Sequence, residues 1–421
     1  MPSTPRQGGD GVADKTNTKK DSHYLSGKEI RAIARENRKI TRALEKHKHR
    51  RADESEFVTK MKDKNNILEI ENLHTYFYTD QGVVKAVNGV SFNVPKNATV
   101  GIVGESGCGK SVTSMSVMQL IQGPAGQIVS GQIRFNSEDY KRDENGAPIA
   151  FEDADGNTYF ETEEKVYDIA NMPVHEIYRI RGRQIAMIFQ EPMTSLNPVF
   201  TIGNQLDEVT FVHVPGATKE MAKEASLKML ALVGIADPEH VYNSYPHELS
   251  GGMRQRVMIA MALACNPRLI IADEPTTALD VTIQAQILDL FRSLKDKING
   301  SILLITHDLG VVAEMADYVV VMYAGRAIEQ GTVREIFHNP KHPYTVGLQK
   351  SKPTMDSDSD QLFNIPGNVP NPVNMPNHCY FKERCSKCTK KCSGEYPGMV
   401  QLSPTHFVAC HLYTEEGENN G

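Results

Sequence analysis

The sequence predicts an α/β protein built around a parallel sheet. Short apolar runs of strand character alternate with helical patterns along the middle of the chain, and such alternation is typical of a parallel sheet covered by helices. One of these runs, residues 99–103 (TVGIV), leads directly into a glycine-rich loop, and a helical pattern follows the loop. A strand, a glycine-rich loop and a helix in this order form a unit whose backbone amides can surround an anion.

The predicted elements follow one another as short, well-separated segments. Besides 99–103, the predicted strands are residues 67–73, 83–90, 185–189, 269–272, 302–305 and 318–322. The predicted helices are residues 111–121, 220–233 and 252–264. Residues 136–165 interrupt the pattern with ten acidic against three basic residues, and we interpret them as a surface hairpin inserted into the fold.

We divide the 421 residues into three parts. Residues 1–65 form a basic N-terminal extension, residues 66–335 the main α/β domain, and residues 336–421 a C-terminal region. The extension carries 17 Lys and Arg against 10 Asp and Glu, a net of +7, whereas the rest carries 29 against 42, a net of −13. A mainly acidic body argues against nucleic acid as the partner, because phosphate backbones bind to basic surfaces.

The apolar runs of the chain are all short. None reaches the roughly 18–20 residues that cross a bilayer, and residues 1–11 contain no hydrophobic stretch of the kind that a secretory signal needs. We therefore expect the chain to stay in the cytoplasm and to act at a membrane only through partners.

An amphipathic helix is predicted in the extension, at about residues 27–46. Ser26 and Glu29 form a capping box, in which each side chain accepts a hydrogen bond from an amide at the helix start. Five residues then recur at spacings of three and four, which places them on one face of the helix: Ile30, Ile33, Asn37, Ile40 and Leu44. Lys and Arg cover the other faces. Two interpretations remain open, a solvated extension and a helix that lies on a partner or an anionic membrane surface.

The glycine-rich loop, residues 104–111 (GESGCGKS), fits the pattern G-x-x-x-x-G-K-[ST] of phosphate-binding loops. In this pattern Lys110 reaches the β- and γ-phosphates and the Ser111 hydroxyl holds Mg²⁺. Cys108 occupies a free position of the pattern, and we expect no chemistry from it. A second buried strand leads to Asp273, which is suited to hold the water shell of Mg²⁺, and Glu274 follows as a candidate general base.

The stretch between these two sites resembles a family signature. Residues 249–256 (LSGGMRQR) resemble the signature motif of ATP-binding cassette (ABC) ATPases, and further motifs occur in the order that this family has. Gln190 resembles the glutamine of the Q-loop, Asp280 the aspartate of the D-loop, and His307 the switch histidine. Phe77 is the best candidate for the aromatic residue that stacks on adenine.

The resemblance to ABC ATPases implies a RecA-like core with an antiparallel β subdomain and an α-helical subdomain, the latter at about residues 190–265. It implies ATP and Mg²⁺ as cofactors, and a head-to-tail dimer in which the signature of one subunit faces the phosphate loop of the other. The implied catalytic residues are Lys110, Gln190, Glu274 and His307. The implied nucleotide-binding residues are Phe77, Gly104, Glu105, Ser106, Gly107, Cys108, Gly109, Lys110, Ser111, Val112, Gln190, Ser250, Gly251, Gly252 and Asp280. The implied Mg²⁺ ligands are Ser111, Gln190 and Asp273.

Three further features resemble one branch of the family, the ATPases of oligopeptide and dipeptide importers. They are residues 190–198 (QEPMTSLNP), residues 339–345 (NPKHPYT), and Met253 at the fifth place of the signature, which is usual for the D-type ATPase of these importers. The resemblance implies ATP-driven peptide uptake by a peripheral protein at the cytoplasmic face of the cell membrane. The implied partners are a second, F-type ATPase subunit, two permease subunits and an extracytoplasmic peptide-binding protein. The alternatives are an importer of nickel or sugars and a soluble ABC ATPase without a transport role.

Five of the seven cysteines crowd into the C-terminal region. Four of them have the spacing C-x5-C-x6-C-x17-C, which resembles the C-terminus of peptide-importer ATPases, some of which carry a [4Fe–4S] cluster: Cys379, Cys385, Cys392 and Cys410. Four thiolates suit an iron–sulfur cluster or Zn²⁺, so the sequence predicts a small metal-binding module. Thiols that are free or joined in disulfides are the third alternative. Cys388 is extra to the pattern.

Overall fold

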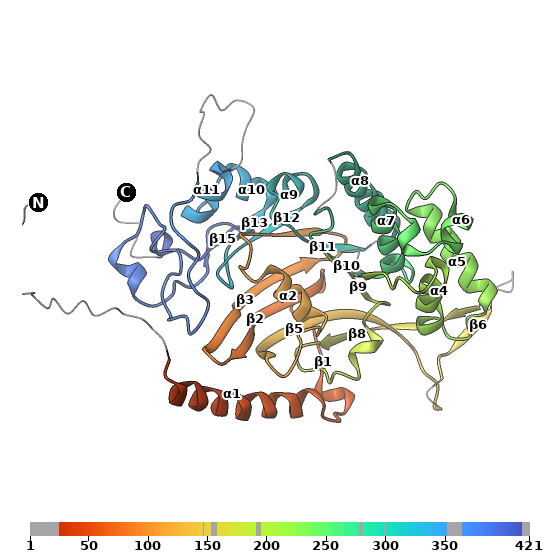
Figure 1. Ribbon diagram of the computed structural model, residues 1–421, viewed down its shortest axis with the longest axis horizontal. Helices are drawn as coiled ribbons and strands as arrows, with labels where there is room; N and C mark the ends of the chain where they lie inside the picture. The colour runs from red at the N-terminus through yellow and green to blue at the C-terminus, as the bar shows by residue number, and fades with distance from the viewer. Residues whose placement is uncertain are drawn as a thin grey trace, which may run out of the picture.

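The computed structural model describes residues 25–145, 147–152, 158–190, 195–277, 281–298, 300–351 and 364–414. Two sheets, with helices packed around them, make up the body of the molecule (Figure 1). Asp280 and residues 191–194, which the sequence assigns to family motifs, lie outside the described residues.

The first sheet is antiparallel throughout. Its strands pair in the order β1 (Val58–Thr59), β8 (Thr162–Asp168), β5 (Gly126–Tyr140), β2 (Asn66–Thr79) and β3 (Gly82–Pro95). Strands β2 and β3 extend the predicted strands 67–73 and 83–90 at both ends, whereas the sequence patterns do not predict β5 or β8. This sheet corresponds to the antiparallel β subdomain that the ABC resemblance implies.

The second sheet contains the predicted parallel strands. They pair in the order β12 (Tyr318–Tyr323), β4 (Thr99–Val103), β11 (Ser301–Ile305), β10 (Leu269–Asp273) and β9 (Ile185–Ile188). All residues of β4, β10 and β11 are buried, because both faces of the sheet are covered, and this explains why their sequences do not alternate. The sheet continues antiparallel beyond β12 through β13 (Arg326–Thr332), β15 (Phe407–Val408) and β14 (Val400–Gln401). The predicted parallel strands thus form the centre of a mixed sheet, and the sequence patterns do not predict its antiparallel edge.

The helices fall into groups by position. Helix α2 (Lys110–Val117) lies between the two sheets, and its last residue Val117 and the following Met118 belong to the core that the sheets share. The helical subdomain, drawn in green in Figure 1, contains α4 (Ile202–His213), α5 (Lys219–Leu232), α6 (Pro238–Asn243) and α7 (Gly251–Leu263). The remaining helices after it are α8 (Val281–Ile298), α9 (Leu309–Met315), α10 (Val333–His338) and α11 (Pro343–Lys350). Short 3₁₀ turns occur at Glu54–Glu56, Ile177–Arg179, Pro246–Glu248, Lys390–Ser393 and His411–Tyr413. Within the described ranges, every helix is too short or too polar to cross a bilayer.

Helix α1 (Gly27–Lys48) starts with the predicted capping box of Ser26 and Glu29. It lies along the antiparallel sheet of the same chain (Figure 1), where the Asn37 side chain donates a hydrogen bond to the backbone carbonyl of Thr79 at 2.9 Å. On the predicted apolar face Asn37 is buried, whereas Ile40 is 37% exposed and its neighbour Thr41 is buried. The helix thus packs on its own subunit, which neither sequence interpretation described.

The acidic segment 136–165 forms a hairpin whose base belongs to the antiparallel sheet. Strands β5 and β8 continue through it, and β6 (Ala150–Glu152) pairs with β7 (Thr158–Phe160) near the tip. Ser137 and Asp139 are buried, and the Asp139 carboxylate accepts a hydrogen bond from the Tyr167 hydroxyl. The interpretation of the whole segment as a surface insertion is therefore wrong for its first residues.

The C-terminal region packs onto the α/β body. Strand β15 pairs with β13, and Tyr380 and Phe381 join a core that also includes Val103, Tyr323 and Tyr344. Figure 1 shows the blue segment against the end of the molecule where β12, β13 and α11 lie. Residues 364–414 therefore complete the body and share its core.

Candidate functional site

The phosphate loop joins β4 to α2, as the sequence predicts. Gly107 and Gly109 have φ angles of +76° and +100°, a conformation that favours glycine. A Cβ atom on Gly109 would lie 2.3 Å from the backbone oxygen of Ala86, so a side chain is excluded there. Gly109 is also the N-cap of α2 and provides no side-chain cap. The amides of the first turn of α2 are thus left for an anion.

Lys110 folds back into this loop. Its side chain is buried, and Nζ donates hydrogen bonds to the carbonyl oxygens of Gly104 at 2.8 Å and Glu105 at 3.1 Å. The loop carbonyls therefore hold the Lys110 ammonium at the phosphate loop.

Ser111 and Asp273 meet where β10 ends. The Ser111 hydroxyl donates a hydrogen bond to Asp273 Oδ1 at 3.0 Å. Asp273 is 5% exposed, and burial raises the pKa of its carboxyl, with the charge of Glu274 adding to the effect. A hydroxyl and a carboxylate side by side are the oxygen donors that Mg²⁺ prefers, so these two residues fit the predicted metal.

Glu274 is the centre of a polar cluster. Its φ is +48°, and its backbone N–H donates to the Ile305 carbonyl at 2.8 Å. Its carboxylate accepts hydrogen bonds from Gln190 Nε2 at 2.9 Å and Thr277 Oγ1 at 3.0 Å, and His307 Nδ1 lies 3.3 Å away. The structure therefore brings together Gln190, Glu274 and His307, which are far apart in sequence. Sequence reasoning missed Thr277, whose only signal is its place three residues after Glu274.

The signature residues lie at the start of α7. The Ser250 hydroxyl caps this helix by accepting a hydrogen bond from the Met253 N–H at 3.3 Å, and Gly251 has no atom within 4 Å of an added Cβ. Among the described residues, no backbone–backbone hydrogen bond joins Ser250 or Gly251 to the phosphate loop. Met253 packs against the core of the helical subdomain. Gln255 is buried, and its Nε2 donates to the Pro275 carbonyl at 2.6 Å, which ties α7 to the residue after Glu274.

The other predicted nucleotide-binding residues are spread around the loop. Phe77 lies half-buried in β2, with its ring against Gly126. Cys108 is 1% exposed, and burial raises the pKa of its thiol. Ser106 is exposed at the tip of the loop, and Val112 packs against the core below it.

Glu105 makes contacts that the sequence did not suggest. Its N–H donates to the Tyr344 hydroxyl, and its carboxylate accepts two hydrogen bonds from Arg384. Both partners belong to the C-terminal region. No local pattern signals them, because the contact joins residues that are 239 and 279 positions apart.

The cysteines of the C-terminal region lie near one another as thiols. Burial raises the pKa of Cys379 and of Cys410 to about 11, and the neighbouring Cys385 and Cys392 add to both shifts. All seven cysteines belong to the described residues, and none forms a disulfide. Within the described residues, however, no three His, Cys, Asp or Glu side chains are arranged to hold one metal ion. The prediction of a metal-binding module is therefore not supported by this geometry.

Comparisons with known proteins agree with the motifs and the fold. Residues 87–277 match the ABC transporter family, and residues 328–392 match the C-terminal region of oligopeptide/dipeptide transporters. The chain is 47% identical over 351 residues to the oligopeptide transport ATP-binding protein AppD of Bacillus subtilis (strain 168), covering 83% of this chain and 98% of that protein. It is 48% identical over 347 residues to the oligopeptide transport ATP-binding protein OppD of the same strain, covering 82% and 88%.

A solved structure shows the same fold. The ATP-binding cassette MJ0796, in a dimeric post-hydrolysis state bound to ADP and Pi, superposes with a TM-score of 0.50 at 23% identity, covering 63% of this chain and 99% of that chain. The nucleotide-binding fold that the sequence predicts is thereby confirmed. The chain belongs to the family of ABC transporter ATP-binding proteins, in its oligopeptide/dipeptide group.

Proposed function

We propose that this chain is the ATPase of an ABC importer and couples ATP binding and hydrolysis to the uptake of oligopeptides or dipeptides. The observation that carries the proposal is the meeting of Gln190, Glu274 and His307 beside the Ser111–Asp273 pair. The names of the relatives favour peptides over nickel or sugars as the substrate, and favour transport over a soluble role.

ATP binding would use the phosphate loop and α2. The loop amides and Lys110 would hold the β- and γ-phosphates, so that phosphate oxygens replace the carbonyls of Gly104 and Glu105 around the ammonium. Ser111, Asp273 and Gln190 would hold Mg²⁺, directly or through water, and the ion would neutralise phosphate charge. Phe77 would stack on adenine.

Hydrolysis would use Glu274 as the general base on the attacking water. Its carboxylate is held by Gln190 and Thr277, which fixes the direction in which it can accept a proton. His307 lies next to the same carboxylate and would stabilise the charge that develops on the γ-phosphate.

The second half of each nucleotide site would come from another subunit. Ser250 and Gly251 are exposed at the N-terminus of α7, where a hydroxyl and helix amides can bind an anion. Asp280 would act at the same interface. We place a related F-type ATPase opposite this chain, because Met253 resembles the D-type signature and D-type subunits pair with F-type ones. Met253 itself packs inside its own subunit. A stable and fully active homodimer together with the permeases would contradict this pairing.

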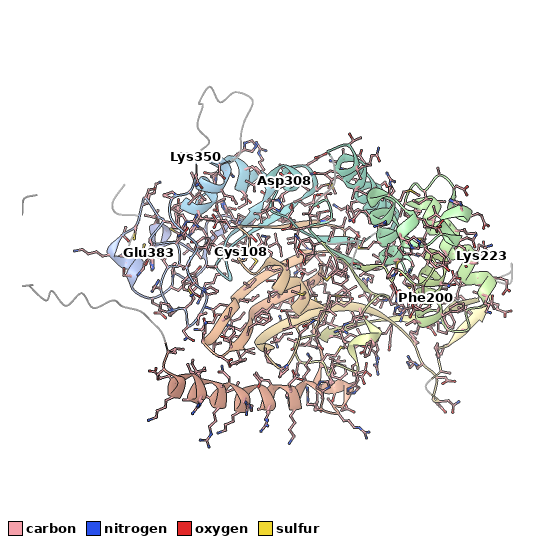
Figure 2. All side chains as sticks on the ribbon, viewed as in Figure 1. Cys108, Phe200, Lys223, Asp308, Lys350 and Glu383 are labelled. Atoms are coloured by element: carbon pink, nitrogen blue, oxygen red, sulfur yellow. The ribbon has the colours of Figure 1, made fainter. Side chains whose placement is uncertain are left out.

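The permease contact would lie on the helical subdomain. Val199 is 74% exposed and Phe200, labelled in Figure 2, is 52% exposed. Apolar side chains this exposed are typical of interaction sites, and they follow the segment 190–198 that resembles peptide importers. Contact with two permeases would keep the chain peripheral at the cytoplasmic face of the membrane, and an extracytoplasmic binding protein would deliver the peptide.

The [4Fe–4S] cluster, with Zn²⁺ as its alternative, remains a proposal for Cys379, Cys385, Cys392 and Cys410. Its support is the resemblance of the four cysteines to the family pattern, together with the closeness of Cys385 and Cys392 to Cys379 and Cys410, whose pKa values they help to raise. The thiols would have to approach one another further and lose their protons, which a bound metal favours. Anaerobic purification should give a brown protein with about four irons per chain. A colourless protein without iron or zinc would exclude both metals.

Two variants test the transport function together. In the complex with its permeases, Lys110→Ala should lose ATP binding and peptide uptake, because one cation is removed from the phosphates, and such losses cost on the order of 10²–10³ in rate. Glu274→Gln should keep ATP binding and lose hydrolysis, because only the base is removed. Radiolabelled peptide uptake and phosphate release are the measurements. Normal turnover by either variant would contradict the assigned roles.

A further inference from the structure

The C-terminal region contacts the phosphate loop through the side chain of Arg384. Its guanidinium donates two hydrogen bonds to the Glu105 carboxylate, from Nη1 to Oε2 at 2.8 Å and from Nη2 to Oε1 at 3.0 Å. The Arg384 side chain is 6% exposed and that of Glu105 is 26% exposed. Bidentate pairs of this kind are stronger and more directional than single hydrogen bonds.

Arg384 is itself held in one orientation. Its Nε donates to the Pro366 carbonyl at 3.0 Å and its Nη1 to the Tyr323 hydroxyl at 3.3 Å. The guanidinium carbon lies 5.7 Å from the centre of the Tyr323 ring and 5.8 Å from that of Phe381. Arginine keeps its charge in proteins, so the cation is permanent, and these contacts preorganise it.

The backbone of Glu105 is held as well. Its N–H donates to the hydroxyl of Tyr344 at 2.9 Å, and its carbonyl accepts a hydrogen bond from Lys110. Tyr344 is fully buried in α11 and packs against the rings of Tyr323 and Phe381. The C-terminal region thus fixes the side chain and the N–H of the same loop residue.

A carboxylate on an anion-binding loop repels the anion unless a cation neutralises it. We propose that Arg384 is a positioning residue, which neutralises Glu105 and fixes its orientation, so that the C-terminal region sets the affinity of the phosphate loop for ATP. Arg384 acts through Glu105 and does not touch the nucleotide. The inference rests on the proposed function, since it takes ATP as the ligand of the loop.

The test compares ATP binding by the purified full-length chain in four variants: Arg384→Ala, Arg384→Lys, Glu105→Gln and the double variant Arg384→Ala with Glu105→Gln. Displacement of a fluorescent ATP analogue in the presence of Mg²⁺ gives the affinities. Arg384→Ala should bind ATP about tenfold more weakly, the effect of losing one charged hydrogen-bonded pair. Lys keeps the charge without the planar fork, so Arg384→Lys should fall between Arg384→Ala and the wild type. Lys390→Ala is the matched control, because it removes an exposed cation from the same region.

The double variant separates positioning from a structural role. If the cost comes from the uncompensated charge of Glu105, Glu105→Gln should restore the affinity of Arg384→Ala to within about threefold of the wild type. In the assembled transporter, Arg384→Ala should raise KM for ATP and leave kcat nearly unchanged. Unaltered affinity in Arg384→Ala, or a loss that Glu105→Gln does not rescue, would overturn the proposal. If the wild-type chain did not bind ATP, or bound it no better than Lys110→Ala, the proposed function would be overturned instead.

Discussion

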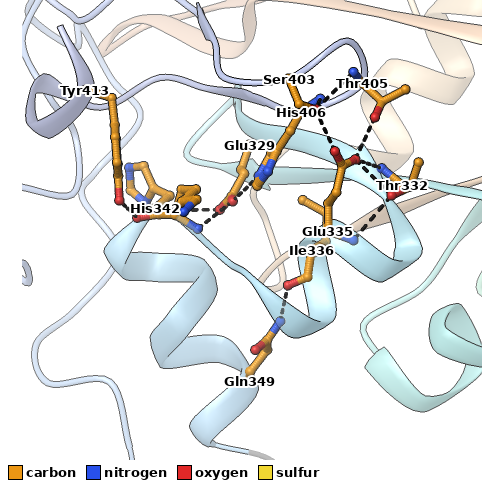
Figure 3. A network of polar contacts seen from close by, with 11 residues as sticks. Glu329, Thr332, Glu335, Ile336, His342, Gln349, Ser403, Thr405, His406 and Tyr413 are labelled. Carbon is orange, nitrogen blue, oxygen red and sulfur yellow. Dashed lines mark hydrogen bonds and ion pairs between the residues drawn. The ribbon is translucent and has the colours of Figure 1, made fainter.

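Replacing Glu329 should destabilise the whole C-terminal end of the protein. Figure 3 shows this carboxylate at the centre of a buried network. Its Oε1 accepts hydrogen bonds from the Lys341 N–H at 2.6 Å and the His406 Nε2 at 2.8 Å, and its Oε2 accepts one from the His342 N–H at 2.9 Å. Glu329 is 0% exposed, and His342 and His406 are 2% and 3% exposed.

The size of the effect follows from these contacts. In Glu329→Ala the donors of His342 and His406 lose their acceptor without access to water, at about 1–3 kcal/mol each. The void adds to this, so the free energy of unfolding should fall by about 3–5 kcal/mol. Glu329→Gln keeps the shape and one oxygen but turns an NH₂ group towards a donor. Its loss should be about 1–2 kcal/mol.

Urea unfolding followed by far-UV circular dichroism measures the loss, since the chain contains no Trp for fluorescence. Glu383→Ala is the matched control: Glu383 is exposed in the same region, and its replacement should stay within about 0.5 kcal/mol of the wild type. If Glu329→Ala unfolded at the same urea concentration as the wild type, the reasoning would be refuted, because two buried donors without an acceptor must lower the stability.

Three further predictions concern the loop, the helical subdomain and pH. Gly109→Ala should weaken ATP binding more than tenfold, because its Cβ would lie 2.3 Å from a backbone oxygen. The Cβ of Gly107→Ala meets no atom within 4 Å, so this variant should lose less ATP affinity. Titration with nucleotide compares the two variants. Gln255→Ala should lower kcat but not ATP affinity, because it removes the hydrogen bond from α7 to the residue after Glu274, the proposed base. An ATPase assay measures this effect, with Gln286→Ala as the exposed control. Burial opposes the ionisation of Glu335, but hydrogen bonds from neighbouring hydroxyls and an amide outweigh it and lower its pKa from 4.5 to about 2. The ionised Glu335 therefore contributes its full stabilisation of the fold above pH 4.5, and this contribution is lost as the pH falls towards 2. In urea unfolding, the difference in unfolding free energy between the wild type and Glu335→Gln should shrink by about 1 kcal/mol across that range. An advantage that does not change with pH would contradict the shift.

The parts of the site that the sequence predicts are those with a local pattern. The phosphate loop follows its strand directly, and Glu274 follows Asp273, so their neighbours in the chain identify them. The pairing of Glu105 with Arg384 has no local pattern, because only the folded chain brings them together.

The errors in the fold have equally physical causes. Apolar spacing groups Ile40 with the other residues of one face of α1, but packing buries the neighbouring Thr41 and leaves Ile40 37% exposed. Strands β14 and β15 contain two residues each, too few for any periodicity, and their pairing with the sheet defines them. The sequence therefore predicts elements that have a local periodicity better than elements that form only by pairing with a distant segment.

Because Glu105 and Arg384 are far apart in the sequence, Glu105 is synthesised well before its partner. Glu105 leaves the ribosome 279 residues before its partner, which at ordinary elongation rates is an interval on the order of tens of seconds. Strands β11 and β12, between which β4 pairs, are also synthesised in that time, so the phosphate loop and α2 can form while the glutamate still carries an uncompensated charge. On the proposed role of Arg384, the newly made chain therefore reaches its full affinity for ATP only after the C-terminal region has been translated and has docked.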